Sequence, residues 1–313
     1  MLDAAGPQAA RIADLWWLTL CVCALVFAAV MAMFVWALWR APRGDAGMPP
    51  DVAPGGERRL GWSVGIGIAV SSVLLIGLLV ASVLTDRALA LMPVDDALNV
   101  RVIAHQYWWE VVYDNPQPDR VFATANELYI PVGRPVVVTL QADDVIHSFW
   151  VPNLHGKKDL IPGRTATIRF RADRPGEFVG RCAEYCGLQH AFMAFDVVAL
   201  SAERFAAWAD AQRKPAADPG DAAAQRGREL FLSGSCMLCH AIQGTTANAR
   251  KAPDLTHVAS RARLAAGRLA NTPQTLAAWI VDPQRIKPGV NMPAHLLTSD
   301  DLAALVAYLE TLK

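Results

Sequence analysis

Two long apolar segments near the start of the sequence limit what this chain can become. Residues 15–39 contain one polar side chain, Thr19, and residues 61–84 are interrupted only by glycines and serines. A helix of about 20 apolar residues is long enough to cross the ~30 Å hydrocarbon core of a bilayer. The rest of a 313-residue chain could hardly bury two such helices. We therefore predict two transmembrane helices, residues 15–39 and 61–84, preceded by a short segment, residues 1–14.

Positive charge beside the helices predicts their orientation. The connection between them, residues 40–60, carries Arg40, Arg43, Arg58 and Arg59. Only Arg11 and Arg87 flank the opposite ends of the two helices. Short loops rich in arginine remain in the cytoplasm. We therefore expect the connection in the cytoplasm, and both termini with the bulk of the chain on the outer, periplasmic side of the membrane.

Overall charge and composition exclude two other classes. The sequence has 29 basic and 29 acidic residues, so it lacks the basic excess that would bind nucleic acid by neutralising phosphates. Its apolar fraction of 53% excludes an intrinsically disordered chain.

Residues 95–200 have the pattern of short β-strands. Between positions 165 and 172, Ala166, Ile168, Phe170 and Ala172 alternate with threonine and arginine. Such alternation is typical of a strand with one buried face. Residues 136–140 and 194–200 are further candidate strands, and Pro-Gly pairs separate several of the segments. This part of the chain is predicted to be a β-sandwich.

The remaining sequence is predicted to be helical, with candidate segments at 201–212, 225–232, 272–281 and 299–312. Residues 214–224, rich in Pro, Ala, Gly and Asp, are predicted to be a flexible linker within a helix-and-linker segment, 201–224. Thr272 followed by Pro273 is typical of a helix start, and Ser299 is the expected cap of the last helix. We predict an all-α domain over residues 225–313.

The sandwich segment ends in a cluster of soft metal ligands. Cys186, His190 and Met193 have the spacing of a blue-copper ligand loop, and His147 is the natural distant ligand. Cys182 adds a second thiolate, which lets two sulfurs bridge two copper ions.

In such a centre, the backbone carbonyl of Glu184 is a candidate weak ligand for one copper, and Met193 for the other. Taken alone, the cysteine pair also fits a disulfide or, together with His190, a structural zinc site.

A second motif, Cys236-Met-Leu-Cys239-His240, is the attachment signature of c-type haem. The cysteines are expected to bind the haem covalently and His240 to ligate its iron. Met292, flanked by prolines, is the expected opposite ligand, because a thioether raises the haem potential. His257 and His295 are the alternatives. A zinc knuckle would need a second pair of nearby ligands.

The sequence resembles subunit II of the haem–copper cytochrome c oxidases, fused to a C-terminal cytochrome c domain. Matching stretches are 147–152, 157–164, 174–176 and the whole 182–193 loop, together with the two preceding helices. The resemblance implies a cupredoxin fold (a Greek-key β-sandwich) over residues 95–200, followed by a class I cytochrome c domain over 225–313. It also implies a dinuclear CuA centre and a role for the Glu184 side chain in binding magnesium at the boundary with subunit I.

The resemblance further implies partners and an electron route. Subunit I, subunit III and a soluble or membrane cytochrome c are the expected partners, in a bacterial inner membrane. The family has an aromatic cluster for electron entry where this chain has Tyr107, Trp108 and Trp109. Its usual entry tryptophan aligns with Tyr107, so the sequence departs there. At the spacing of a proton-entry glutamate stands Arg59, and Glu57 is interpreted as a solvated loop acid.

The expected function is therefore electron transfer in respiration. Electrons pass from a cytochrome c donor through the haem to CuA and on to subunit I, where O2 is reduced to water with proton pumping. The isolated chain would carry electrons without an oxygen-reducing site. Quinol oxidases lack these copper ligands. A metal-delivery or redox-sensing protein would not need the haem, and a nitrous-oxide-type reductase needs more than the 7 histidines present.

Overall fold

The computed structural model describes residues 3–41 and 54–313. They form two compact units, one of residues 10–92 and one of residues 3–9 with 93–313. Most of the predicted cytoplasmic connection, including Arg43, lies outside the described residues.

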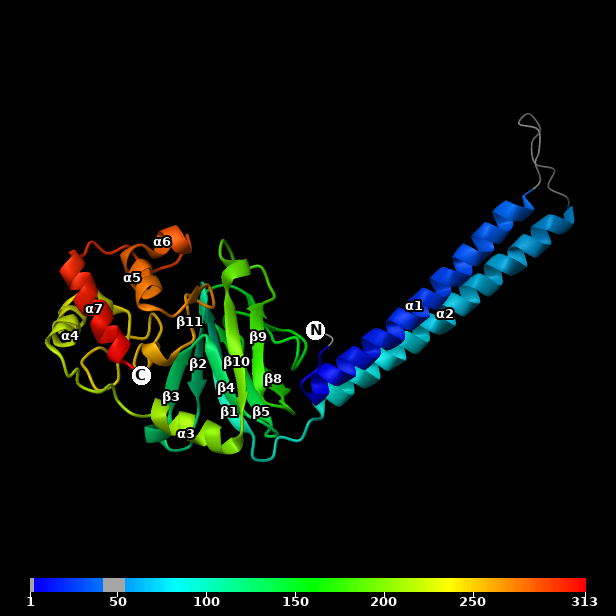
Figure 1. Ribbon diagram of the computed structural model, residues 1–313. Coiled ribbons are helices and arrows are strands. Elements are labelled where there is room, and N and C mark those ends of the chain that lie inside the picture. Colours follow the sequence, from blue (N-terminus) through cyan, green and yellow to red (C-terminus); the bar gives the residue numbers. More distant parts are fainter. Residues whose placement is uncertain (1–2, 42–53) are drawn as a thin grey trace. The chain divides into compact units, whose positions relative to one another are not determined.

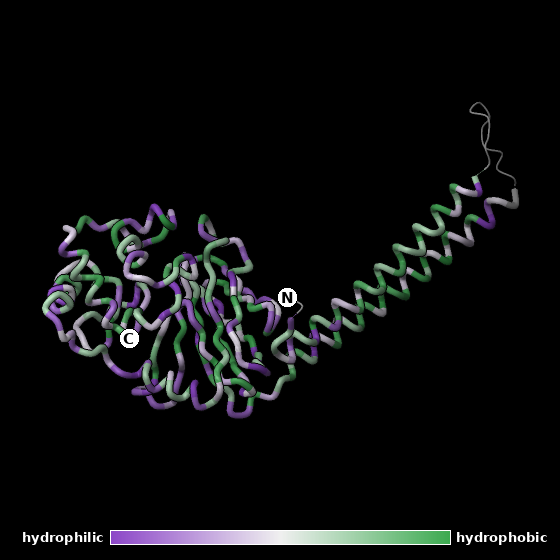
Figure 2. Tube along the Cα trace, viewed as in Figure 1, coloured by the Kyte–Doolittle hydropathy of each residue, from purple (hydrophilic) through white to green (hydrophobic). Residues whose placement is uncertain are grey.

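The first unit consists of two long helices, α1 (Pro7–Arg40) and α2 (Pro54–Ala90), which run in opposite directions (Figure 1). Both are long and apolar enough to cross a membrane. Figure 2 shows hydrophobic residues along most of their length, and their apolar side chains are exposed. α1 begins at Pro7, within the segment 1–14 that was expected to precede the first helix. Proline suits this position because the first helical N–H has no partner in the helix.

The second unit begins with a β-sandwich, as predicted. One sheet has the order β3-β2-β1-β5-β8 and the other β4-β10-β9-β6-β7. The strands are β1 (Leu98–His105), β2 (Trp108–Tyr113), β3 (Phe122–Ala125), β4 (Glu127–Pro131), β5 (Val136–Ala142), β6 (His147–Trp150), β7 (Lys158–Leu160), β8 (Ala166–Phe170), β9 (Gly176–Cys182) and β10 (Ala194–Leu200). The pairs β1–β5 and β4–β10 are parallel and the others antiparallel. We call residues 98–200 the sandwich domain.

The alternating sequence of β8 fits this packing. Ile168 and Phe170 are buried, while Thr167 and Arg169 between them are exposed. Alternate residues of a strand point to opposite faces, so the apolar set meets the core between the two sheets. β10 follows the same rule, with Phe195 and Val197 buried. A short 3-10 helix, η1 (Pro118–Arg120), connects β2 to β3.

Helix α3 (Ala202–Gln212) follows β10 directly, and the Ser201 side chain caps it by accepting a hydrogen bond from the Arg204 amide. Its Trp208 stacks on Tyr129 at a centroid distance of 4.2 Å. The helix thereby covers one end of the sandwich core.

The C-terminal domain, residues 222–313, is helical as predicted. Its helices are α4 (Ala222–Ser233), α5 (Pro273–Val281), α6 (Pro283–Ile286) and α7 (Ser299–Thr311), with the short 3-10 helices η3 (Ser235–Leu238) and η4 (Val258–Ser260). A two-stranded ribbon, β11 (Arg263–Leu264) and β12 (Leu269–Ala270), was not anticipated. Thr272 caps α5 with Pro273 at its first position, as expected. The cap of α7 is Thr298, so the prediction of Ser299 was wrong by one residue.

The linker is more ordered than its composition predicted. The Lys214 carbonyl lies 3.1 Å from Nε2 of His257, and the Ala216 amide donates to the Gln243 carbonyl at 2.9 Å. α4 begins at Ala222, capped by Asp221, which shortens the connection further. The expectation of a freely flexible tether over residues 214–224 was therefore wrong, because the C-terminal domain binds its first residues.

Close packing of α4 against α7 depends on Gly227. A Cβ at this position would lie 2.0 Å from the Ala304 carbonyl oxygen, so Gly227→Ala must push the two helices apart. We expect it to lower the free energy of unfolding of the C-terminal domain by about 1–3 kcal/mol, the usual cost of overpacking. Urea titration of the full chain measures this. Gly220→Ala is the control, because nothing lies within 4 Å of its Cβ. Equal stability of the two variants would contradict the prediction.

Candidate copper and haem sites

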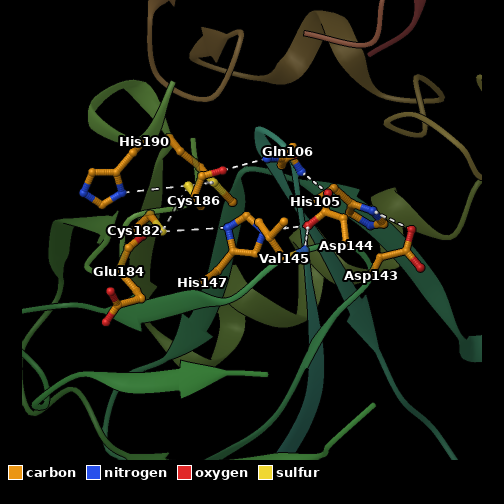
Figure 3. Close-up of polar contacts among 11 residues, drawn as sticks. His105, Gln106, Asp143, Asp144, Val145, His147, Cys182, Glu184, Cys186 and His190 are labelled. Carbon is orange, nitrogen blue, oxygen red and sulfur yellow. Dashed lines mark hydrogen bonds and ion pairs between the residues drawn. The ribbon is translucent and has the colours of Figure 1, made fainter. Parts of the chain in front are cut away.

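The predicted copper ligands converge at one end of the sandwich domain (Figure 3). His147 begins β6 and Cys182 ends β9, while Cys186, His190 and Met193 lie on the connection to β10. The copper loop, residues 182–193, is closed by a hydrogen bond from the Cys182 amide to the Met193 carbonyl at 3.1 Å. It is joined to β6 by a bond from the Ala183 amide to the Ser148 carbonyl at 3.0 Å. Two strands and one short loop thus position every side chain of the set.

The distances within the set suit metal binding. The ligand atoms of His147, Cys182 and Cys186 all lie within 4.8 Å of one another, and all three residues are buried. The two sulfur atoms are 3.8 Å apart, and each lies 3.8 Å from one imidazole Nδ1: Cys182 from His147, and Cys186 from His190.

Two weaker donors complete the group. Met193 Sδ is 3.9 Å from Cys186 Sγ, and the Glu184 carbonyl oxygen is 3.2 Å from Cys182 Sγ. A disulfide would need sulfur atoms about 2.05 Å apart, whereas these thiols are free. The ligand set therefore fits a pair of soft metal ions bridged by two thiolates better than a disulfide.

The electrostatics of the site favour one negative charge on the cysteine pair. The hydrogen bond between the two sulfur atoms lowers the pKa of Cys182 and raises the pKa of Cys186, and burial raises the pKa of Cys186 further. Burial alone would lower the pKa of His147, but hydrogen bonds to Asp144 and Cys182 raise it overall. A metal ion bound here would have to displace the protons that Cys186 and His147 hold.

Two neighbours of the site were not singled out from the sequence. Asp144 Oδ1 lies 2.8 Å from Nε2 of His147, which directs Nδ1 of that ring toward Cys182. Gln106 donates from Nε2 to the Cys186 carbonyl at 2.7 Å. The only sequence signal for Asp144 is its place three residues before His147, and Gln106 gave none. Both side chains orient ligands without being ligands.

The side chain of Glu184 points away from the sulfur cluster (Figure 3). Its Oε2 lies 3.5 Å from the Lys157 ammonium, and the side chain is 42% exposed. The carboxylate therefore faces Lys157 and solvent, and its role in binding magnesium stays a prediction.

The three aromatic residues predicted for electron entry have different surroundings. Trp109 is fully buried in the sandwich core, with its ring centroid 6.2 Å from that of His147. Trp108 stacks on His105 at 4.4 Å. Tyr107 is 6% exposed, and its hydroxyl oxygen accepts a hydrogen bond from the Leu188 amide in the copper loop. Tyr107 therefore contacts the copper loop and Trp109 packs against His147, but neither is open to solvent.

The haem motif forms a tight turn at η3. The Cys239 and His240 amides both donate to the Cys236 carbonyl, at 3.2 and 3.0 Å. Nδ1 of His240 lies 2.7 Å from the Pro253 carbonyl oxygen, and no described residue hydrogen-bonds Nε2. Burial lowers the pKa of His240, which keeps the ring neutral. A neutral imidazole with a fixed Nδ1–H and a free Nε2 fits an axial iron ligand.

The candidates for the opposite ligand differ in their contacts. Met292 lies in the loop between α6 and α7, and its carbonyl accepts a hydrogen bond from Gln284 Nε2 at 2.9 Å. His257 has both ring nitrogens against backbone carbonyls, those of Lys313 and Lys214, at 2.8 and 3.1 Å. His257 is therefore engaged within the protein and does not suit the role, while Met292 and His295 remain candidates.

Comparisons with known proteins identify the families of both domains. Residues 111–200 match the family model described as the periplasmic domain of cytochrome c oxidase subunit II, and residues 224–313 match the one described as cytochrome c. Cytochrome c oxidase subunit 2 of Alkalihalophilus pseudofirmus is 38% identical over 100% of this chain and 90% of its own length. The Bacillus subtilis protein of the same name is 33% identical over 100% of this chain and 91% of its own length.

Among solved structures, the periplasmic domain of subunit II from Bradyrhizobium japonicum is 30% identical. The match covers 37% of this chain and 93% of the Bradyrhizobium japonicum chain, with a TM-score of 0.35. The relatives matched over the full length carry the assignment, because they span both helices and both domains. This chain belongs to the cytochrome c oxidase subunit II family.

Proposed function

We propose that this chain delivers electrons from a cytochrome c donor to subunit I of its oxidase. The route runs through a haem c held by Cys236, Cys239, His240 and Met292, and then through a dinuclear CuA centre in the copper loop. When bound, each group accepts and releases one electron at a time. Family membership makes the chain a subunit of a haem–copper oxidase complex. Reduction of O2 to water, with proton pumping, takes place in subunit I.

The observation that carries this proposal is the convergence of six donor atoms, two of which are cysteine sulfurs 3.8 Å apart. His147, Cys182, Cys186, His190, Met193 and the Glu184 carbonyl supply thiolate, imidazole, thioether and carbonyl donors. Soft sulfur and imidazole ligands select copper. Strands β6 and β9 fix two of these residues, which would hold the ligand set in one geometry.

The residues of the haem site have separate tasks in this proposal. Cys236 and Cys239 anchor the macrocycle covalently, and the Pro253 carbonyl holds His240 in one orientation at 2.7 Å. Met292 supplies a thioether that raises the haem potential. A high potential suits a carrier that accepts electrons from another cytochrome.

Contacts at the start of the chain support the proposed orientation in a bacterial inner membrane. The Ala5 amide donates to the Asn153 carbonyl at 2.8 Å, and Asp3 pairs with Arg174 at 2.6 Å. The segment before α1 thus lies on the same side as the sandwich domain. With the arginine-rich connection 40–60 in the cytoplasm, both termini are periplasmic. Subunit I and subunit III are the proposed neighbours, with Glu184 binding magnesium at the boundary with subunit I.

Metal analysis of the purified full chain tests the proposal. We expect two copper atoms and one iron atom per polypeptide, with the visible bands of c-type haem. The isolated chain should not consume oxygen at oxidase rates. A single copper, or zinc in its place, would contradict the dinuclear centre and favour a metal-delivery or redox-sensing role for the cysteine pair.

Replacing Asp144 should weaken copper binding without removing a ligand. Asp144→Asn removes the charge 2.8 Å from His147 Nε2. Mutation of such a supporting carboxylate typically lowers metal affinity about 10–100-fold. Competition titration of the full chain with a copper chelator measures the change.

The matched control is Asp143→Asn, whose carboxylate lies 3.3 Å from the ring of His105, a residue outside the ligand set. We expect little change in copper affinity for this variant. Equal losses in both variants would mean that general charge, and not the orientation of His147, controls binding.

A further inference from the structure

A buried lysine lies where the C-terminal domain meets the sandwich domain. Lys287, at the end of α6, is 1% exposed. Its Nζ donates to the Tyr107 carbonyl at 2.8 Å and to the Ala265 carbonyl at 3.1 Å. The first acceptor belongs to the sandwich domain and the second to the C-terminal domain. No described carboxylate is among the charged groups that act on this ammonium group, and burial lowers its pKa to about 7. Burying an amine is costly, so the two carbonyls must hold it.

The residues after Lys287 contact the copper loop directly. Gln189, 7% exposed, donates from Nε2 to the Pro288 carbonyl at 2.7 Å. A Cβ at Gly289 would lie 3.1 Å from Leu188 Cδ1, and the φ of Gly289 is +88°. Glycine therefore allows the two loops to approach closely. Loop 287–290 thus lies on the pair of residues that immediately precedes the copper ligand His190, and it leads to Met292.

A second element of the C-terminal domain contacts the other end of the copper loop. The turn between β11 and β12 places Ala265 and Ala266 at φ of +53° and +57°. The Ala266 carbonyl accepts a hydrogen bond from the Ala194 amide at 3.1 Å, directly after the ligand Met193. Alanine rarely adopts this backbone conformation, and surrounding contacts must maintain it. The strained turn thus directs successive carbonyls at Lys287 and at the sandwich domain.

Further contacts join the two domains around the copper loop. The Ala262 amide donates to Glu127 Oε1 at 3.0 Å, and Arg263 lies 3.8 Å from Asp196. The Arg268 guanidinium lies over the Phe192 ring at 4.2 Å. These contacts give the interface a defined orientation, because each joins one particular pair of side chains or backbone groups.

We propose that loop 287–290 and turn 264–267 form a built-in docking surface that seats the C-terminal domain on the copper loop. Lys287 is the positioning residue of this interface: it holds the loop carrying Met292 against Tyr107 and Gln189. The same contact covers Tyr107. An external cytochrome would therefore dock on the C-terminal domain, and not on the aromatic residues that receive electrons in the family that this sequence resembles. The inference rests on the proposed function and specifies where its one-electron step between the two sites occurs.

Hydrogen exchange of the full chain with both cofactors tests the interface. Lys287→Met keeps the side-chain length and leaves the Tyr107 and Ala265 carbonyls buried without their donor. Such losses shift an equilibrium by about tenfold or more. We expect protection of the Ala194 and Ala262 amides, which donate across the interface, to fall about tenfold. Amides within β5 should be unchanged. Lys251→Met is the control, because Lys251 is an exposed lysine of the same domain.

A second readout separates positioning from damage to either site. After photoreduction of the haem, we expect Lys287→Met to slow electron transfer to copper severalfold, while the visible spectra of both sites stay unchanged. If Lys287→Met does not fold, Gln189→Ala weakens the same interface from the sandwich side. Unchanged protection and rate in the folded variants would overturn the docking proposal. Absent transfer in the unaltered chain with both cofactors would instead overturn the proposed function.

Discussion

Replacing Cys186 by serine is expected to abolish the dinuclear copper centre and nearly all oxygen consumption by the assembled oxidase. Cys186 Sγ lies near three other donor atoms of the site, at 3.8 Å from Cys182 Sγ and from His190 Nδ1 and 3.9 Å from Met193 Sδ. A serine oxygen is a poor ligand for copper, which prefers soft sulfur. The variant should hold at most one copper per chain, measured by metal analysis, and should pass no electrons to subunit I.

The haem provides an internal control for this variant. Cys236 and Cys239 belong to the other domain, so the haem bands should keep their intensity. Cys23→Ser is the matched control, because Cys23 is exposed on α1, far in sequence from the copper loop. A Cys186→Ser protein with full copper content and undiminished activity would exclude the thiolate-bridged centre.

The convergence of most of the candidate copper ligands could be predicted because they are close in sequence. Cys182, Cys186, His190 and Met193 lie on one loop. They therefore stay close together however the surrounding strands are arranged. His147 was predicted because the loop holds one histidine and a copper site of this kind takes a second one from a distant strand. The supporting contacts could not be predicted in this way. Asp144 acts through the direction of its side chain at the edge of β6, and only the fold fixes that direction.

The interface between the two domains illustrates the larger limit. In sequence, Lys287 is a lysine before a Pro-Gly pair, a pattern typical of an exposed turn. Its burial depends on carbonyls 180 and 22 positions away, at Tyr107 and Ala265. The linker was misjudged for a related reason: its composition favours flexibility, but His257 binds the Lys214 carbonyl. Local composition predicts how a segment behaves by itself. The burial of Lys287 and the order of the linker both depend on residues distant in sequence.

The cap of α7 was missed for a different reason. Thr298 and Ser299 are adjacent and both are good N-cap residues, so propensity alone cannot choose between them. The choice depends on which hydroxyl faces a free amide, and here the Thr298 side chain accepts from the Asp301 amide. Helix boundaries commonly shift by a residue or two on such grounds.

Replacing Met292 by leucine is expected to lower the haem potential by on the order of 100 mV. Axial ligands set haem potentials over a range of about 0.8 V, and a thioether favours the high end. Leucine keeps the volume and removes the sulfur. Because ~59 mV corresponds to tenfold for a one-electron couple, the fall would displace the electron equilibrium between donor and haem about 50-fold. A redox titration of the full chain, followed in the visible spectrum, measures the shift.

Two further variants make this result specific to the sulfur of Met292. Met237→Leu removes a thioether from within the haem-attachment turn, at η3, where it cannot reach the opposite face of the haem, and should leave the potential unchanged. His295→Ala removes the remaining imidazole candidate. If His295 were the ligand, its loss would shift the potential and Met292→Leu would not. If Met292 is the ligand, Met292→Leu shifts the potential and His295→Ala does not. The contacts of Gln284 favour Met292: its side chain binds the carbonyls of Val290 and Met292 at 2.6 and 2.9 Å and so fixes the backbone that presents the thioether.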